Sequence, residues 1–213
     1  VDAMILDGYG VINVGDGLVA GIDELFDQAA KRHVPIIVLT NGASFGAEMA
    51  WQKYKKWGLA IARNHVVSSR DALEAALQDR PAGIVYGSLS GTSKPLGYED
   101  ELCYGRDADF FEQANEFVLL GTIDWNSDNQ DQFEAAMRQR KRRIHVANPD
   151  VVSPQSSGFS IEPGYWAMRA MKNTGVPVSW YGKPHVASFE TAFARLEAVT
   201  GQRFEKSRVA MVG

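Results

Sequence analysis

Short apolar runs alternate with amphipathic segments along the first 80 residues of the chain. The runs at 2–6 and 36–39 consist mostly of aliphatic residues and have the length of buried strands. Three segments carry apolar residues at helical spacing, at 22–32, 44–57 and 71–77. Ser44 is a typical N-cap for the second of these helices, and Gly58 is a typical stop. Strands that alternate with helices predict a parallel sheet covered by helices, which is an α/β fold.

The pattern changes near residue 81 and returns near residue 178. Apolar runs of strand length occur at 84–86, 117–120, 144–147, 178–181 and 209–212. Helical spacing recurs at 128–143, 165–173 and 187–199. The first of these helices would end in the basic run 138–143. Basic side chains complement the dipole at a helix C-terminus, so we interpret this run as a solvated helix end rather than a nucleic-acid contact.

Composition narrows the class of protein. The chain has 213 residues, of which 45% are hydrophobic and 23% charged, as in soluble globular proteins. A net charge of −4 does not favour nucleic-acid binding. Cys103 is the only cysteine, which excludes an internal disulfide and fits a reducing compartment. No apolar run approaches the roughly 20 residues of a membrane helix. We therefore predict a cytoplasmic protein with neither a nucleic-acid nor a membrane partner.

The candidate chemistry lies where predicted strands end. Asp7 follows the first strand, and Thr40 and Asn41 follow the second. In open α/β sheets, ligands bind at the carboxyl ends of the strands. A carboxylate there can hold a hard cation or attack phosphorus, and a threonine hydroxyl can hold a phosphoryl oxygen. Lys183 follows the run 178–181 and would supply the positive charge that phosphoryl transfer requires.

Four segments occur in a characteristic order. They are Asp7-Gly8-Tyr9-Gly10, Leu39-Thr40-Asn41, Tyr181-Gly182-Lys183-Pro184-His185 and the final run 209–213. Motif by motif, this order resembles the haloacid dehalogenase-like superfamily of hydrolases over nearly the whole chain. Asn148-Pro149-Asp150 and Pro163-Gly164 look like subclass IIA, the branch of nitrophenylphosphatases and sugar phosphatases.

The resemblance implies a Rossmann-like parallel-sheet core interrupted by an inserted α/β cap. Asn41 and Lys183 are separated by 141 residues, far more than one crossover helix requires. We place the core at 1–80 and 178–213 and the cap at 81–177. The cap would close over the site and exclude water. By the same resemblance, a homodimer through the cap is expected.

The resemblance also implies a role for each candidate residue. Asp7 would be the nucleophile and a Mg²⁺ ligand, and Lys183 would stabilise both the nucleophile and the transferring phosphoryl group. The backbone carbonyl of Tyr9 would be a second metal ligand, and a further Asp is expected beyond Gly213. Substrate and phosphate would be bound by Thr40, Asn41, Asn148 and Asp150. The implied activity is that of a magnesium-dependent phosphatase acting on a small phosphomonoester, a sugar phosphate or similar metabolite, through an aspartyl-phosphate.

Tyr9 departs from the family pattern. Phosphatases of the family carry an Asp at this position as general acid and base, and a phenol is a poor base at neutral pH. One alternative is therefore a slow or non-catalytic member that binds a phosphometabolite or a partner. Haloacid dehalogenases, which need no metal, share the Asp-x-Tyr-Gly pattern. Their cap lies between the first two motifs, whereas only 33 positions separate Asp7 from Thr40, so this alternative ranks below phosphatase.

Overall fold

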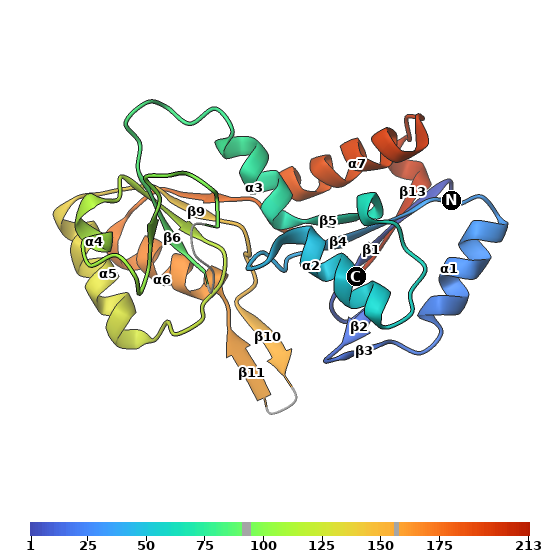
Figure 1. Ribbon diagram of the computed structural model, residues 1–213, viewed down its shortest axis with the longest axis horizontal. Helices are drawn as coiled ribbons and strands as arrows, with labels where there is room; N and C mark the ends of the chain where they lie inside the picture. The colour runs from blue at the N-terminus through green and yellow to red at the C-terminus, as the bar shows by residue number, and fades with distance from the viewer. Residues whose placement is uncertain (91–94, 156–157) are drawn as a thin grey trace.

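The computed structural model describes residues 1–90, 95–155 and 158–213 and places most strands in two parallel sheets (Figure 1). The first sheet has the order β13-β1-β4-β5, with strands at Val209–Val212, Ala3–Asp7, Ile36–Thr40 and Val66–Ser68. The second has the order β12-β9-β8-β6-β7, with strands at Val178–Trp180, Ile144–Val146, Glu116–Leu119, Tyr86–Leu89 and Leu102–Cys103. Every strand pair within these sheets is parallel, which confirms the Rossmann-like α/β class.

Helices cover both faces of the first sheet. α1 (Ile22–Lys31) and α2 (Gly46–Lys56) pack on one face, whereas α7 (Val186–Thr200) packs on the other. Every residue of β4 is therefore buried, as parallel strands require. Two short strands, β2 (Asn13–Val14) and β3 (Gly17–Leu18), form a small hairpin after β1.

The ends of two helices differ from their predicted positions. α2 begins at Gly46, and Ser44 does not cap it. The Ser44 hydroxyl instead donates to the carbonyl of Leu120, 3.3 Å away and next to the second sheet. α3 (Ser69–Leu77) begins two residues earlier than predicted, because the Asp71 carboxylate accepts the backbone N–H of Ser68 at 2.7 Å.

The second sheet has its own aromatic core. α4 (Phe110–Gln113), α5 (Ser127–Gln139) and α6 (Pro163–Thr174) cover one face. Phe117 of β8 packs there against Phe133 of α5, with ring centroids 4.9 Å apart. α3 covers part of the other face, where Leu73 and Leu77 join the apolar cluster of β8. α3 thus packs between the two sheets (Figure 1).

The basic run 138–143 at the end of α5 is exposed, as we expected, except at Arg142. α5 ends at Gln139, and Arg142 is buried. The Arg142 guanidinium donates to the carbonyl oxygens of Phe111 and Ala114 and lies 4.8 Å from the ring centroid of Phe117. Burial lowers the pKa of Arg142 to about 10. The interpretation is wrong for this residue because carbonyl groups left unpaired after α4 need a donor.

The second sheet extends beyond the boundary that we expected at residue 177. Strand β12 pairs with β9 of the second sheet, with Val178 opposite Ile144, so it lies outside the first sheet. A hairpin absent from the sequence-based expectations follows β9, formed by β10 (Val152–Gln155) and β11 (Gly158–Ile161). It projects away from the second sheet (Figure 1). Two short 3₁₀ helices complete the described elements, at Arg63–His65 and Lys206–Arg208. No helix among the described residues is long and apolar enough to span a bilayer.

Candidate active site

A cleft of about 1220 Å³ lies between the carboxyl end of the first sheet and the segments that follow β9 and β12. Seven of the residues that line it are those singled out from the sequence: Asp7, Tyr9, Thr40, Asn41, Asn148, Asp150 and Lys183. Four of these come from the first sheet's strand ends and the loop after β1, because the register places Asp7 opposite Leu39 and Thr40 next to it. The structure therefore brings all seven candidates to one place.

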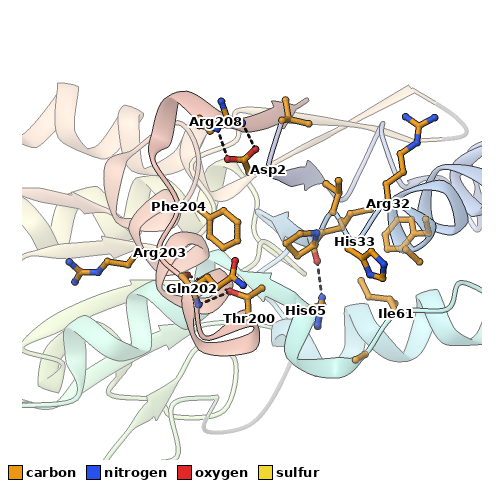
Figure 2. A pocket seen from close by; sticks show the side chains of 18 of the residues that line it. Asp2, Arg32, His33, Ile61, His65, Thr200, Gln202, Arg203, Phe204 and Arg208 are labelled. Carbon is orange, nitrogen blue, oxygen red and sulfur yellow. Dashed lines mark hydrogen bonds and ion pairs between the residues drawn. The ribbon is translucent and has the colours of Figure 1, made fainter.

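A second cavity, of about 910 Å³, lies at the opposite end of the first sheet (Figure 2). None of the seven candidate residues lines it. Two side chains of this cavity already have partners: Arg208 pairs with Asp2, and the His65 ring contacts the carbonyl of Ile36 at 2.9 Å. It lies at the amino ends of the strands, away from the edge where open α/β sheets bind ligands.

An ion pair occupies the floor of the cleft. The Lys183 ammonium contacts Oδ1 of Asp7, with side-chain exposures of 13% and 27%. Both groups are shielded from water yet still accessible from the cleft. A shielded carboxylate beside a fixed ammonium is a suitable arrangement for attack on an electrophile that carries negative charge.

Asn41 fixes the backbone at Lys183. Its Oδ1 accepts the Lys183 N–H at 2.8 Å, and its Nδ2 donates to the Lys183 carbonyl at 3.0 Å and to Asp150 Oδ1 at 2.9 Å. A Cβ on Gly182 would lie 2.6 Å from the Ala147 carbonyl oxygen, so only glycine fits there. The Asn41 side chain thus positions Lys183, a role that its position next to Thr40 did not reveal.

Asp150 is a carboxyl group whose pKa is raised by its surroundings. Burial is the main cause that raises its pKa, and the charge of Asp7 adds to this, while the Asn41 hydrogen bond and the charge of Lys183 oppose it. The side chain of Asn148 is used locally: its Oδ1 accepts the Asp150 N–H at 3.0 Å, and its Nδ2 donates to Glu162 at 3.1 Å. Glu162 lines the cleft but has no motif that would have predicted it.

Tyr9 connects the loop after β1 to the hairpin. Its hydroxyl donates to the Pro154 carbonyl at 2.7 Å, across 145 positions of the sequence. The main-chain bonds around it run from Asn13 N–H to the Gly8 carbonyl and from Gly10 N–H to the Asn13 carbonyl. Within the described residues, the Tyr9 carbonyl takes part in none of these bonds, so it can serve as a ligand.

The donors present fit a magnesium ion in part. No group of three His, Cys, Asp or Glu side chains that could hold a metal occurs in the described ranges. Mg²⁺ commonly takes only one or two carboxylates from a protein and completes its shell with water and phosphate oxygens. The Asp7 carboxylate and the Tyr9 carbonyl are hard oxygen donors of this kind. The further Asp expected after Gly213 stays a prediction.

Tyr54 is a residue of the cleft that we did not identify from the sequence. It lies on α2 and is buried, yet it lines the cleft. Burial, and to a smaller extent the charge of Asp7, raises its pKa well above the ordinary value of a tyrosine. From the sequence, a tyrosine on the apolar face of a helix predicts core packing and not a place in a ligand site.

Comparisons with known proteins find relatives among the hydrolases that the motifs resemble. The family model described as haloacid dehalogenase-like hydrolase matches residues 4–94, which confirms the resemblance inferred from the motifs. The acid sugar phosphatase of Staphylococcus haemolyticus is 24% identical over 98% of this chain and 76% of its own length.

Two solved structures share the fold. A possible sugar phosphatase from Cytophaga hutchinsonii has a TM-score of 0.83 and 23% identity, and the match covers 99% of this chain and 76% of that chain. A glycerol phosphate phosphatase from Mycobacterium tuberculosis, solved in complex with magnesium, has a TM-score of 0.72 and 20% identity, with 92% and 59% covered.

Proposed function

We propose that this haloacid dehalogenase-like hydrolase is a phosphatase that acts on a small phosphomonoester, a sugar phosphate or a similar metabolite. The observation that carries the proposal is the ion pair of Asp7 and Lys183 in the cleft between the two sheets. The similarity to an acid sugar phosphatase supports the same reaction class. It disfavours the alternative of a slow or non-catalytic binding protein.

The proposed reaction has two steps. A carboxylate oxygen of Asp7 attacks phosphorus, and the bond from phosphorus to the alcohol oxygen breaks, which gives an aspartyl-phosphate. Water then attacks this phosphorus, the bond from phosphorus to the Asp7 oxygen breaks, and inorganic phosphate leaves. The proton lost by the water returns to the acid that protonated the alcohol, and the Asp7 carboxylate is restored. Lys183 neutralises charge on the transferring group, and Asn41 keeps it in place.

We propose Mg²⁺ as the cofactor, held by the Asp7 carboxylate and the Tyr9 carbonyl. When bound, it would polarise the phosphoryl oxygens. The glycerol phosphate phosphatase solved with magnesium supports this choice.

The leaving alcohol needs a proton, and Tyr9 is poorly placed to give it. Its hydroxyl proton is directed to the Pro154 carbonyl. Asp150 lines the same cleft, lies near enough to Asp7 for that charge to act on it, and has a raised pKa. We therefore assign protonation of the leaving group to Asp150, in place of the substrate contact first expected of it.

The test is phosphate release from a panel of sugar phosphates and other small phosphomonoesters, with and without Mg²⁺. Asp7→Asn keeps the shape of the side chain but removes the nucleophile, so turnover should fall by at least about 10³-fold. Phosphate release that survives Asp7→Asn would refute the proposal. Halide release from 2-haloacids without metal would instead favour a dehalogenase.

Location and assembly are also proposals. We propose a cytoplasmic protein without a nucleic-acid partner, supported by its net charge of −4 and its single, buried cysteine. A homodimer through the cap is supported by apolar side chains exposed on that part, namely Ile123, Phe159 and Met168. Light scattering coupled to size-exclusion chromatography would measure the mass in solution.

A further inference from the structure

We propose that the hydroxyl group of Tyr54 donates a hydrogen bond to the phosphoryl group of the substrate, next to Thr40. This inference rests on the proposed phosphatase function and adds to it a residue that neither the motifs nor the comparisons single out. Four observations support it: the burial of the ring, the space at Gly8, the unpaired hydroxyl and the charge of its surroundings.

The ring of Tyr54 is held firmly. The residue is only 3% exposed and belongs to the apolar cluster between α2 and the first sheet. Its ring packs against Trp57 with centroids 6.2 Å apart. Because the ring is fixed by packing, the hydroxyl at its far end has little freedom to move away from the cleft that it lines.

Gly8 provides the space for this hydroxyl. A Cβ on Gly8 would lie 2.7 Å from Tyr54 Oη and 3.0 Å from Thr40 Oγ1. The backbone at Gly8 does not have a positive φ, so its conformation does not itself demand glycine. Because Gly8 has no side chain, the hydroxyl groups of Tyr54 and Thr40 can both lie close to its backbone.

The Tyr54 hydroxyl has no protein partner. It makes no hydrogen bond to any other described residue. Among the described residues, the fully buried side-chain atoms without a partner are Ser68 Oγ and Trp166 Nε1, and the Tyr54 hydroxyl is not one of them. A hydroxyl that lacks a partner in an otherwise buried residue is costly unless water or a ligand pairs with it. The cleft is the place from which such a partner can come.

The surroundings favour a donor rather than a negative charge. Tyr54 stays protonated beside the Asp7 carboxylate, as its raised pKa indicates. Thr40 Oγ1 already accepts the Gly42 N–H at 3.1 Å, so the Thr40 proton is also free for an acceptor in the cleft. Phosphoryl oxygens are acceptors only, and hydrogen bonds to charged oxygens are the stronger ones.

The experiment compares Tyr54→Phe with the unchanged chain, with Mg²⁺ present. The variant keeps the ring and removes only the hydroxyl. A hydrogen bond to a charged group corresponds to about 10- to 100-fold in binding or rate, so we expect kcat/KM and the affinity for inorganic phosphate to fall by this factor. The melting temperature should stay within about 2 °C of the original value, since the apolar packing is kept. Calorimetric titration with phosphate gives the affinity.

Tyr98→Phe is the matched control. The Tyr98 hydroxyl donates to the Leu77 carbonyl at 3.0 Å, outside the cleft, so its loss should leave phosphate affinity and kcat/KM unchanged. Equal phosphate affinity and kcat/KM in Tyr54→Phe and the unchanged chain would overturn this inference alone, provided that Asp7→Asn still abolishes turnover. If the unchanged chain neither released nor bound phosphate, both this inference and the proposed function would fail.

Discussion

The two parallel sheets use polar residues in opposite ways. At the carboxyl end of the first sheet, Asp7 and Lys183 form an ion pair in the cleft, and both keep part of their surface accessible. In the second sheet, the polar side chains on and near the strands bond to one another, outside the cleft. Ser88 donates to the buried Glu101, and His145 lies between Glu116 and Tyr181, with ring nitrogens 2.6 and 2.9 Å from their oxygens.

This difference distinguishes polar groups that can bind a ligand from polar groups that stabilise the fold. Buried polar groups that satisfy one another fix a core but offer nothing to a ligand. The charged groups of the Asp7–Lys183 ion pair are partly accessible, so each can interact with a substrate in the cleft. The second sheet contributes to the site through the segments that follow its strands, which carry Asn148, Asp150, Pro154 and Lys183.

The largest expected effect is on stability and comes from the second sheet. Phe117→Ala removes a fully buried ring that contacts Phe133 and the Arg142 guanidinium. We expect the free energy of unfolding to fall by about 3–5 kcal/mol, as for other buried aromatic residues. Urea unfolding followed by circular dichroism measures this change. A loss below about 1 kcal/mol would show that this core is not the structural part of the molecule.

A smaller effect, on the rate of hydrolysis, is expected for Asp150, which the segment after β9 brings to the cleft. Asp150→Asn removes the proposed proton donor, so hydrolysis of an alkyl phosphate should slow by about 100-fold. Hydrolysis of 4-nitrophenyl phosphate, whose leaving group needs little protonation, should slow much less. Because the pKa of Asp150 is raised, turnover of alkyl phosphates by the unchanged chain should decline as the pH rises through that pKa. Equal slowing on both substrates would exclude a role as proton donor.

The smallest expected effect is the dependence of stability on pH. Burial lowers the pKa of His145 below its ordinary value of 6.5, and Glu116 only partly offsets this. Below that ordinary value the unfolded chain binds more protons than the folded chain, so stability should fall as the pH drops below about 6.5. His145→Gln should flatten this dependence, whereas His33→Gln, at an exposed position, should not. Thermal unfolding at several pH values measures both.

The site residues that could be predicted from the sequence are those that directly follow apolar runs of strand length. Asp7 and Thr40 follow apolar runs, and carboxyl ends of parallel strands gather at one edge, so their proximity follows from the fold class. Lys183 also follows an apolar run, but that run is β12 of the second sheet, so its contact with Asp7 does not follow from this rule. The basic run shows where this reasoning stops. Nothing in the order of residues distinguished Arg142, which is buried over Phe117, from neighbours that point to solvent.

The sequence by itself determined the α/β class, the order of the motifs and the residues at the floor of the cleft. These features depend on the spacing of apolar residues and on where polar residues follow them, and both can be read from short stretches of sequence. Only the tertiary structure decided that β12 joins the second sheet, that Asn41 fixes Lys183 across 142 positions and that Tyr9 bonds to Pro154. It also decided that the hydroxyl of Tyr54 occupies the space left by Gly8. Such contacts depend on packing between segments far apart in the chain, which no local pattern encodes.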